Sequence, residues 1–196
     1  MEFEKEITVE IDTSLDKLKD ILHKNKFQIK EVYDLIDIYM VKKDIDIKDN
    51  YLDILKNCVL LRHIIEENKE TKQITYKYKE YNDIGEILNQ GKVNCRVESI
   101  DAAYELLKQL GYNKLIEIKD HISVYASDTC ELCVQEVNNK HIYIEIEDKC
   151  HYINKNYKTI DEMKNEFEKY NIPIKNNDYF VKKAEIELKE MFNQEI

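Results

Sequence analysis

The chain has 196 residues, of which 43% are hydrophobic and 36% are charged, so it is long enough to bury a core as one domain spanning residues 1–196. Its formal net charge of -10 disfavours binding to nucleic acid, because a phosphate polymer requires a broad basic surface. No run of apolar residues approaches the length that a bilayer requires, so the composition also disfavours a membrane protein.

The N-terminal segment, MEFEKEITVEID, alternates polar and apolar residues from the start. A period of two is typical of a half-buried β-strand, with Ile7, Val9 and Ile11 on the apolar side. The segment lacks both the basic start and the apolar stretch of a secretory signal peptide. We therefore expect a strand here and a cytoplasmic protein.

Four helices are predicted from capping residues and apolar spacing. The first begins after Ser14, and the second covers about residues 99–110 and stops at Gly111. The third opens with the capping box Thr159–Glu162. The last covers about residues 178–192, where apolar residues recur at helical spacing.

Between these helices the chain alternates with a period of two, so each run has an apolar side and a polar or charged side. In the run IEIKDHISVY, Lys119 and His121 fall on the polar side, and Ile118 falls on the apolar side that we expect under a helix. The runs expected as strands are KEITVEI, DIYMV, VLLRHI, ITYKYKEY, NCRVES, IEIKDHISVY, CELCVQEV and HIYIEIE.

The number of strands bears on the fold. An antiparallel sheet of seven or eight strands usually curls or closes, and closure would turn the polar sides into an interior. Such an interior suits a charged ligand and not a lipid. We therefore predict an α+β fold: a closed antiparallel eight-stranded β-barrel with helices packed on its outside. An open sheet used for protein contacts is an alternative, and it predicts no cavity.

The five cysteines are odd in number and follow no secretion signal, which favours reduced thiols over a disulfide framework. Cys130 and Cys133 form the only pair at metal-ligand spacing. A zinc site needs two further ligands, and His141, Cys150 and His151 lie nearby without forming a second tight pair. Zinc is therefore a minor alternative.

The order of charged motifs along the chain resembles the CYTH family of triphosphate tunnel enzymes. The family is named for class IV adenylyl cyclases and thiamine triphosphatases, and it also contains inorganic triphosphatases. The resemblance covers nearly the whole chain and rests on the order, spacing and strand side of short motifs. The matching motifs are Glu4-Lys5-Glu6, Asp37-Ile38-Tyr39, Leu61-Arg62, Thr75-Tyr76-Lys77, Arg96-Val97-Glu98, Leu110-Gly111-Tyr112, Lys119-Asp120-His121 and Glu145-Ile146-Glu147.

The chain departs from the family pattern at three positions. Thr8 stands where the family has a lysine, Ile64 where it has an arginine, and His121 where it has another arginine. An imidazole can still donate a hydrogen bond to phosphate. Each lost cation weakens the hold on a polyanion, because charge compensation supplies most of the catalysis in phosphoryl transfer.

The resemblance implies a division of roles among the charged residues. Basic side chains neutralise the triphosphate, and carboxylates bind Mg²⁺ or Mn²⁺, which prefer oxygen ligands. The catalytic residues implied are Glu4, Glu6, Lys77 and Arg96. The substrate-binding residues implied are Arg62, Lys77, Lys79, Arg96, Lys119 and His121. The metal ligands implied are Glu6, Glu98, Glu145 and Glu147.

The leading functional hypothesis is divalent-metal-dependent processing of a triphosphate in a charged tunnel. The resemblance leaves open whether the substrate is inorganic triphosphate, thiamine triphosphate or ATP, and whether the reaction is hydrolysis or cyclisation. The alternative is a weakened tunnel that binds phosphorylated small molecules without turnover, which the changes at Thr8 and Ile64 favour. A homodimer is compatible with either function.

Overall fold

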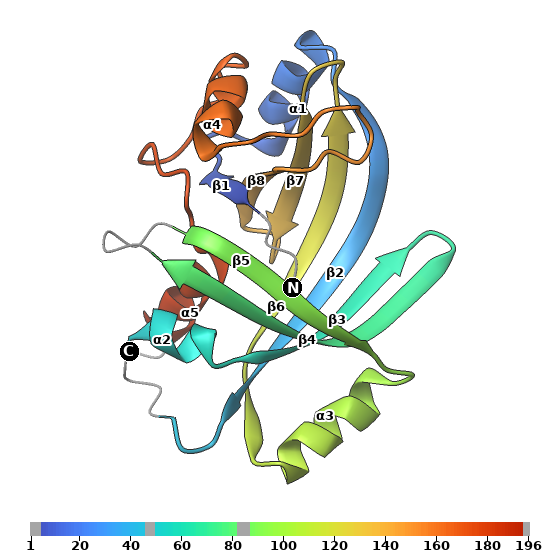
Figure 1. The fold of residues 1–196 in the computed structure, drawn as a ribbon, viewed down its shortest axis with the longest axis vertical. Coiled ribbons are helices and arrows are strands. Elements are labelled where there is room, and N and C mark those ends of the chain that lie inside the picture. Colours follow the sequence, from blue (N-terminus) through green and yellow to red (C-terminus); the bar gives the residue numbers. More distant parts are fainter. Residues whose placement is uncertain (1–4, 46–49, 82–86, 194–196) are drawn as a thin grey trace.

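The structure is a computed structural model that describes residues 5–45, 50–81 and 87–193, with the side chains of 79–81 and 87–90 left out. In these ranges the strands are β1 (Glu6–Glu10), β2 (Gln28–Lys42), β3 (Val59–Glu66), β4 (Lys69–Tyr81), β5 (Ile87–Arg96), β6 (Tyr112–Ala126), β7 (Glu131–Val137) and β8 (His141–Glu147). They form one strongly curled antiparallel sheet in the order β1-β8-β7-β6-β2-β3-β4-β5 (Figure 1).

The predicted eight-stranded antiparallel sheet is confirmed, but closure of a barrel is not. The described residues of the two edge strands, β1 and β5, share no ladder of hydrogen bonds. Instead, a segment near the C-terminus pairs with the outer edge of β1. The Thr8 amide donates to the Tyr179 carbonyl at 3.0 Å, and the Val181 amide donates to the Thr8 carbonyl at 3.0 Å. The backbone groups of β1 at Thr8 are therefore already satisfied by this segment.

Helices α1 (Leu15–Lys24) and α4 (Ile160–Glu168) cover the convex face of β1, β7 and β8 (Figure 1). The helices begin where capping predicted, since the Ser14 hydroxyl accepts from the Lys17 amide and the Thr159 hydroxyl accepts from the Glu162 amide. The largest core cluster lies beneath them. It contains Ile7, Val9, Leu18, Leu22, Leu132, Val134, Ile144, Ile146, Met163 and Phe167.

Helix α3 (Ile100–Gln109) packs on the outer face of the sheet at its other end. Ala103 and Leu107 of the helix contact the cluster that contains Met40 and Leu61. The chain leaves the helix through Gly111, whose φ of 89° lies in the left-handed region that glycine adopts without strain. The prediction of this helix and of its glycine stop is confirmed.

Two helices lie against the concave side of the sheet and fill one end of its interior. These are α2 (Tyr51–Lys56), which the sequence analysis missed, and α5 (Lys183–Asn193). Ile54 of α2 and Leu188 of α5 are buried in one cluster with Ile118 of β6. Helix α5 begins later than the expected residue 178, because Tyr179–Val181 is extended beside β1.

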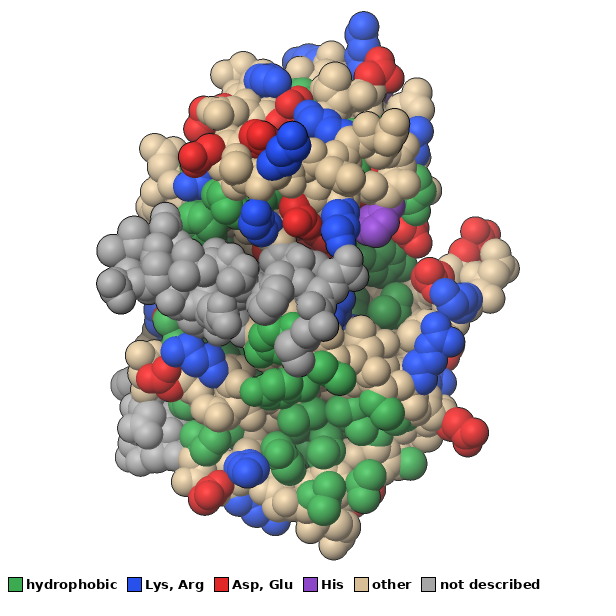
Figure 2. Space-filling model, in the orientation of Figure 1, with side chains coloured by type: hydrophobic (Ala, Val, Ile, Leu, Met, Phe, Trp, Pro, Cys, Tyr) green, Lys and Arg blue, Asp and Glu red, His purple; other side chains and the backbone are tan. Residues whose placement is uncertain are grey.

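The face shown in Figure 2 carries an apolar surface over β4, β5 and α3. Four large apolar side chains in this region are exposed, namely Tyr76, Val93, Leu106 and Leu110. Basic and acidic side chains are interspersed elsewhere in this view, so this face presents no continuous basic surface. Among the described residues, no helix combines the length and the apolar character needed to cross a bilayer.

Candidate functional site

The concave side of the sheet holds a pocket of about 310 Å³, here called the central pocket. Described residues from all eight strands line it, together with the start of α5 and part of α2. Its charged lining consists of the acidic residues Glu6, Asp37, Asp120, Glu145, Glu147 and Glu185 and the basic residues Lys56, Arg62, Lys77, Lys92, Lys182 and Lys183. Six acidic groups thus face six basic groups, although the whole chain carries a net charge of -10. The lining is therefore less acidic than the chain as a whole, and an anionic ligand is compatible with it.

Arg62 and Asp37 form a buried two-point ion pair on the floor of the central pocket. The two residues are directly opposite each other on β3 and β2. Arg62 Nε donates to Asp37 Oδ1 at 2.7 Å, and Arg62 Nη2 donates to Asp37 Oδ2 at 2.6 Å. Burial alone would raise the pKa of Asp37, but the guanidinium charge and its two hydrogen bonds outweigh burial and lower it. The pair fixes the direction of the guanidinium within the pocket.

Lys183, the first residue of α5, reaches the carboxylate of Glu145. The Lys183 Nζ lies 3.0 Å from Glu145 Oε1 and also donates to the side-chain oxygen of Gln135. Gln135 in turn donates to Glu145 Oε2 at 2.6 Å. Although burial raises the pKa of Glu145, the charge and hydrogen bond of Lys183 lower it to about 2. Glu145 is therefore a carboxylate held by a protein cation.

Asp120 of β6 is less well neutralised by Lys183 than Glu145 is. Its nearer oxygen lies 3.8 Å from Lys183 Nζ, and its Oδ1 is buried without a hydrogen-bond partner among the described residues. Burial raises the pKa of Asp120 to about 6, since the partial compensation by Lys183 is too weak to offset desolvation. The pocket therefore contains one carboxyl group that titrates close to neutral pH.

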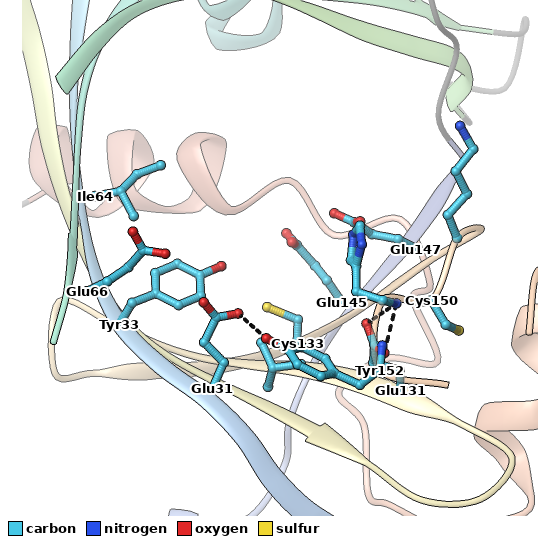
Figure 3. A pocket seen from close by; sticks show the side chains of 13 residues that line it. Glu31, Tyr33, Ile64, Glu66, Glu131, Cys133, Glu145, Glu147, Cys150 and Tyr152 are labelled. Atoms are coloured by element: carbon cyan, nitrogen blue, oxygen red, sulfur yellow. Dashed lines mark hydrogen bonds and ion pairs between the residues drawn. The ribbon is translucent and has the colours of Figure 1, made fainter. Parts of the chain in front are cut away.

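A second pocket of about 490 Å³, here called the outer pocket, adjoins the central one and shares with it Tyr33, Cys133, Glu145 and Glu147. Figure 3 shows these side chains around the cavity, together with Glu31 and Glu131. The Tyr152 hydroxyl donates to Glu31 at 2.8 Å, and the Tyr152 amide donates to Glu131 at 2.7 Å. The outer pocket is thus lined largely by acidic side chains and borders the central pocket.

The structure brings several of the predicted site residues together. Those lining the central pocket are Glu6, Arg62, Lys77, Glu145 and Glu147. Thr8 lies in the same lining, which agrees with the strand side assigned to β1. Ile64 lines the outer pocket. A cavity also exists where an open sheet used for protein contacts predicted none.

The strand side assigned to β6 was wrong. Lys119 and His121 do not line either pocket, and their side chains are 66% and 47% exposed. Lys119 lies 3.5 Å from Glu117, and His121 lies 2.7 Å from Asp34, both on the outer face. At Ile116 and Ile118 the inward side of β6 is apolar because it packs against α2 and α5, which lie inside the curl of the sheet, and Asp120 is a charged residue on that same side. An apolar strand side was assumed to face outward under a helix, and at this end the helices are inside.

Arg96 and Glu98 are also absent from the lining of both pockets. Arg96 is opposite Gln73 at the end of β5, on the same side of the strand as Lys92, but it lies beyond the pocket and is exposed. Glu98 is exposed in the short connection to α3. Glu4 lies outside the described residues, as does the side chain of Lys79.

Sequence reasoning missed six charged residues of the central pocket: Lys56, Lys92, Asp120, Lys182, Lys183 and Glu185. Asp120 was on the side of β6 taken as apolar. Lys183 was placed inside a helix, where nothing in the local pattern distinguishes it from an exposed lysine. Its role depends on where the chain pairs with β1, which only the folded structure reveals.

The carboxylates supply the type of ligand that Mg²⁺ or Mn²⁺ prefers. Glu6 and Glu147 are directly opposite each other on β1 and β8, and Glu145 is opposite Thr8. Among the described residues, no three side chains form a ready-made metal cage. Mg²⁺ is usually held by one or two carboxylates together with substrate phosphates and water, so these residues fit such an ion.

The cysteine pair does not supply a zinc site. Cys130 is fully buried in the core beneath α1 and α4, whereas Cys133 faces the two pockets. The two thiols therefore belong to different sides of the sheet. Within the described ranges no cluster of His, Cys, Asp and Glu is arranged to hold a metal ion.

Comparison with known proteins identifies the fold. No protein-family profile matches the chain, and no curated protein matches it significantly. The PH1819 protein from Pyrococcus horikoshii OT3 is similar in structure, with a TM-score of 0.69, 15% identity, and coverage of 95% of this chain and 99% of that chain. The adenylyl cyclase candidate HpAC1 from Hippeastrum, described as having a dominant triphosphatase activity, has a TM-score of 0.62 and 10% identity, covering 97% and 96%. A protein from Vibrio parahaemolyticus, provisionally named an adenylate cyclase, has a TM-score of 0.57 and 11% identity, covering 92% and 94%. At these identities the likeness establishes a shared fold.

Proposed function

We propose that the central pocket binds a small molecule bearing a triphosphate and processes it with Mg²⁺ or Mn²⁺. The observation that carries the proposal is the charge-balanced lining, in which basic side chains of β3, β4, β5 and α5 face carboxylates of β1 and β8. We further propose that the curled sheet acts as a tunnel, with the outer pocket as its opening. The names of the structural neighbours HpAC1 and the Vibrio protein support this class of substrate.

The basic residues have distinct tasks in this proposal. Arg62, oriented by Asp37, presents its guanidinium from the floor of the pocket. Lys77 and Lys92 are directly opposite each other on β4 and β5 and add two ammonium groups on one wall. Together these groups neutralise phosphate oxygens and hold the chain of phosphates along the pocket, and fixed positive charge also stabilises a phosphoryl transition state.

The carboxylates serve the cation. Glu6 and Glu147, with Glu145 beside them, would hold the metal ion at the wall formed by β1 and β8. When bound, the ion supplies charge neutralisation at phosphate oxygens and a template for the attacking group. Without it, the same carboxylates repel a polyanion, so ligand binding should depend on the metal.

A second candidate is a pocket that binds phosphorylated molecules without turnover. Three observations favour it. Thr8 is buried and carries no charge, Ile64 is apolar, and Lys119 points away from the pocket. Each removes a cation from the set implied by the family resemblance, and cations are what phosphoryl transfer requires.

A ligand screen tests binding, and a product assay separates the two candidates. The melting temperature is measured with inorganic triphosphate, thiamine triphosphate and ATP, each with MgCl₂, MnCl₂ or EDTA. We expect at least one triphosphate to raise the melting temperature more with metal than with EDTA, since stabilisation follows the logarithm of ligand concentration over Kd. Release of phosphate or pyrophosphate from that ligand then supports processing, whereas binding without release supports the second candidate.

A matched pair of variants ties binding to the pocket. Lys77→Met removes a cation from the lining, and we expect it to weaken triphosphate binding about tenfold or more, as loss of a charge-assisted contact does. Lys119→Met makes the same chemical change on the outer face and should leave the affinity unchanged. Equal loss in both variants, or no stabilisation by any triphosphate, would contradict the proposed function.

A further inference from the structure

The route of the chain into α5 delivers one lysine to the centre of the pocket. Residues 179–181 pair with β1 at Thr8. The Thr8 amide donates to the Tyr179 carbonyl, and the Val181 amide donates to the Thr8 carbonyl. Helix α5 starts two residues later with Lys183, whose side chain is 22% exposed. The backbone pairing thus holds the helix start next to β1, and Lys183 lies among the carboxylates of the pocket.

Lys183 supplies a cation close to Thr8, a position at which β1 itself carries no positive charge. Thr8 is 5% exposed and is directly opposite Glu145 on β8. The Lys183 ammonium lies 3.0 Å from that same Glu145 and 3.8 Å from Asp120. A positive charge is therefore present beside Thr8, but it comes from α5 instead of from β1.

The contacts of Lys183 give the side chain two uses. A buried ammonium needs a negative partner, and Glu145 provides it in this structure. Glu145 is also one of the carboxylates that would hold a divalent cation. Lys183 and the cation therefore compete for one carboxylate, and a phosphate entering the pocket offers Lys183 a second anionic partner.

We propose that Lys183 is a phosphate-binding residue of the central pocket. Glu145 pairs with the Lys183 ammonium until a divalent cation binds this carboxylate, and the ammonium is then released to bind a phosphate of the ligand. The inference rests on the proposed function and adds a residue and a coupling to it. A metal ion alone must displace Lys183 from Glu145, so it binds weakly. Metal and triphosphate together satisfy both groups, so each ligand strengthens the binding of the other.

The proposal is tested by calorimetric titration of the full chain with Mn²⁺ alone, with inorganic triphosphate in EDTA, and with triphosphate in the presence of Mn²⁺. In Lys183→Met, the affinity for Mn²⁺ alone should rise and the affinity for triphosphate should fall, each by about tenfold or more. The control is Lys108→Met on α3. Lys108 is 45% exposed and pairs with Glu105, and neither residue lines a pocket, so its loss should change neither affinity.

Two further variants keep the test decisive. Thr8→Lys in the Lys183→Met background places an ammonium opposite Glu145 from β1, and it should restore most of the triphosphate affinity. If Lys183→Met fails to fold, Glu145→Gln is compared with the double variant Glu145→Gln, Lys183→Met, since the latter contains neither partner of the ion pair. In EDTA, the affinity of the double variant for triphosphate should be at least about tenfold lower than that of Glu145→Gln.

The outcomes separate this inference from the proposed function. If the unmodified chain binds triphosphate under none of these conditions, both the proposed function and the role of Lys183 are wrong. Triphosphate binding that is unchanged in Lys183→Met would overturn the role of Lys183 alone. An unchanged affinity for Mn²⁺ in Lys183→Met would overturn the competition for Glu145.

Discussion

Replacing Arg62 with methionine tests how the pocket tolerates an unpaired carboxylate. The side chains of Arg62 and Asp37 are only 14% and 8% exposed, and two hydrogen bonds of 2.7 and 2.6 Å join them. Methionine fills a similar volume without a charge or a donor. The substitution therefore leaves the Asp37 carboxylate buried beside an apolar side chain.

Removing one partner of a buried ion pair costs about 3–5 kcal/mol of unfolding free energy. The charges of Lys77 and Lys183 also favour the Asp37 carboxylate, so we expect the lower end, about 3 kcal/mol. For a chain of this length, such a loss corresponds to a decrease in melting temperature of about 6–12 °C. The double variant Asp37→Asn, Arg62→Met removes both charges and should be more stable than Arg62→Met alone.

The cost should also depend on pH. In the unmodified protein the folded pKa of Asp37 is lowered, so its ion pair stabilises the fold above the unfolded pKa of about 4 and is lost as the pH falls through the folded pKa. In Arg62→Met, burial dominates and raises the pKa of Asp37. Protonation of Asp37 then removes the unpaired charge, so the difference in unfolding free energy between variant and parent should be smaller at pH 5 than at pH 7.

Urea unfolding followed by circular dichroism at both pH values measures these differences. The double variant controls for the loss of packing around the arginine stem. A cost below about 1 kcal/mol at pH 7 would refute the reasoning, since that is the range of an exposed pair. An equal cost in Arg62→Met and in the double variant would show that the unpaired carboxylate is not the cause.

Three further substitutions test other parts of the structure by the same unfolding measurement. Asp120→Asn should stabilise the protein by about 1–3 kcal/mol at pH 7. Burial raises the folded pKa of Asp120 to about 6, so the stability that depends on its proton is present below about pH 4 and is lost as the pH rises through about 6. An equal effect of the substitution at pH 4 and pH 7 would contradict this. Thr159→Ala removes the hydroxyl that accepts from an amide of α4 at 3.2 Å, and it should cost about 1 kcal/mol. Gly111→Ala should cost about 1 kcal/mol from backbone strain alone, since a Cβ there meets nothing within 4 Å; stabilisation would show that the left-handed φ of 89° is wrong.

Local signals predicted the elements whose stability is local. Ser14, Ser99 and Thr159 cap helices where the sequence indicated, because capping requires only a side chain and the amides of the next turn. The sides of β1 and β8 were also predicted correctly. Their apolar residues pack under α1 and α4, so the alternation of these strands reports one buried face and one pocket face.

The same reasoning failed where both faces of a strand meet protein or where a helix lies inside the curl. The inward side of β6 is apolar beside α5, so hydrophobicity alone could not tell the pocket side from the outer side. Helix α2 is short and has its one buried residue at Ile54, which leaves too little pattern to detect. Residues 178–182 carry helical spacing, but residues 179–181 pair with β1 instead.

The sequence by itself determined the strands, most of the helices and the charged rows that face one another across β1, β2, β3, β4 and β8, because alternation and capping act between near neighbours. Only the tertiary structure decided which charges share the pocket. It turned Lys119 outward, left Arg96 beyond the lining, and brought Lys183 to Glu145 from a distant part of the chain. The physical reason is that this ion pair depends on backbone pairing between β1 and residues 179–181, which are far apart in the chain and whose contact leaves no local pattern.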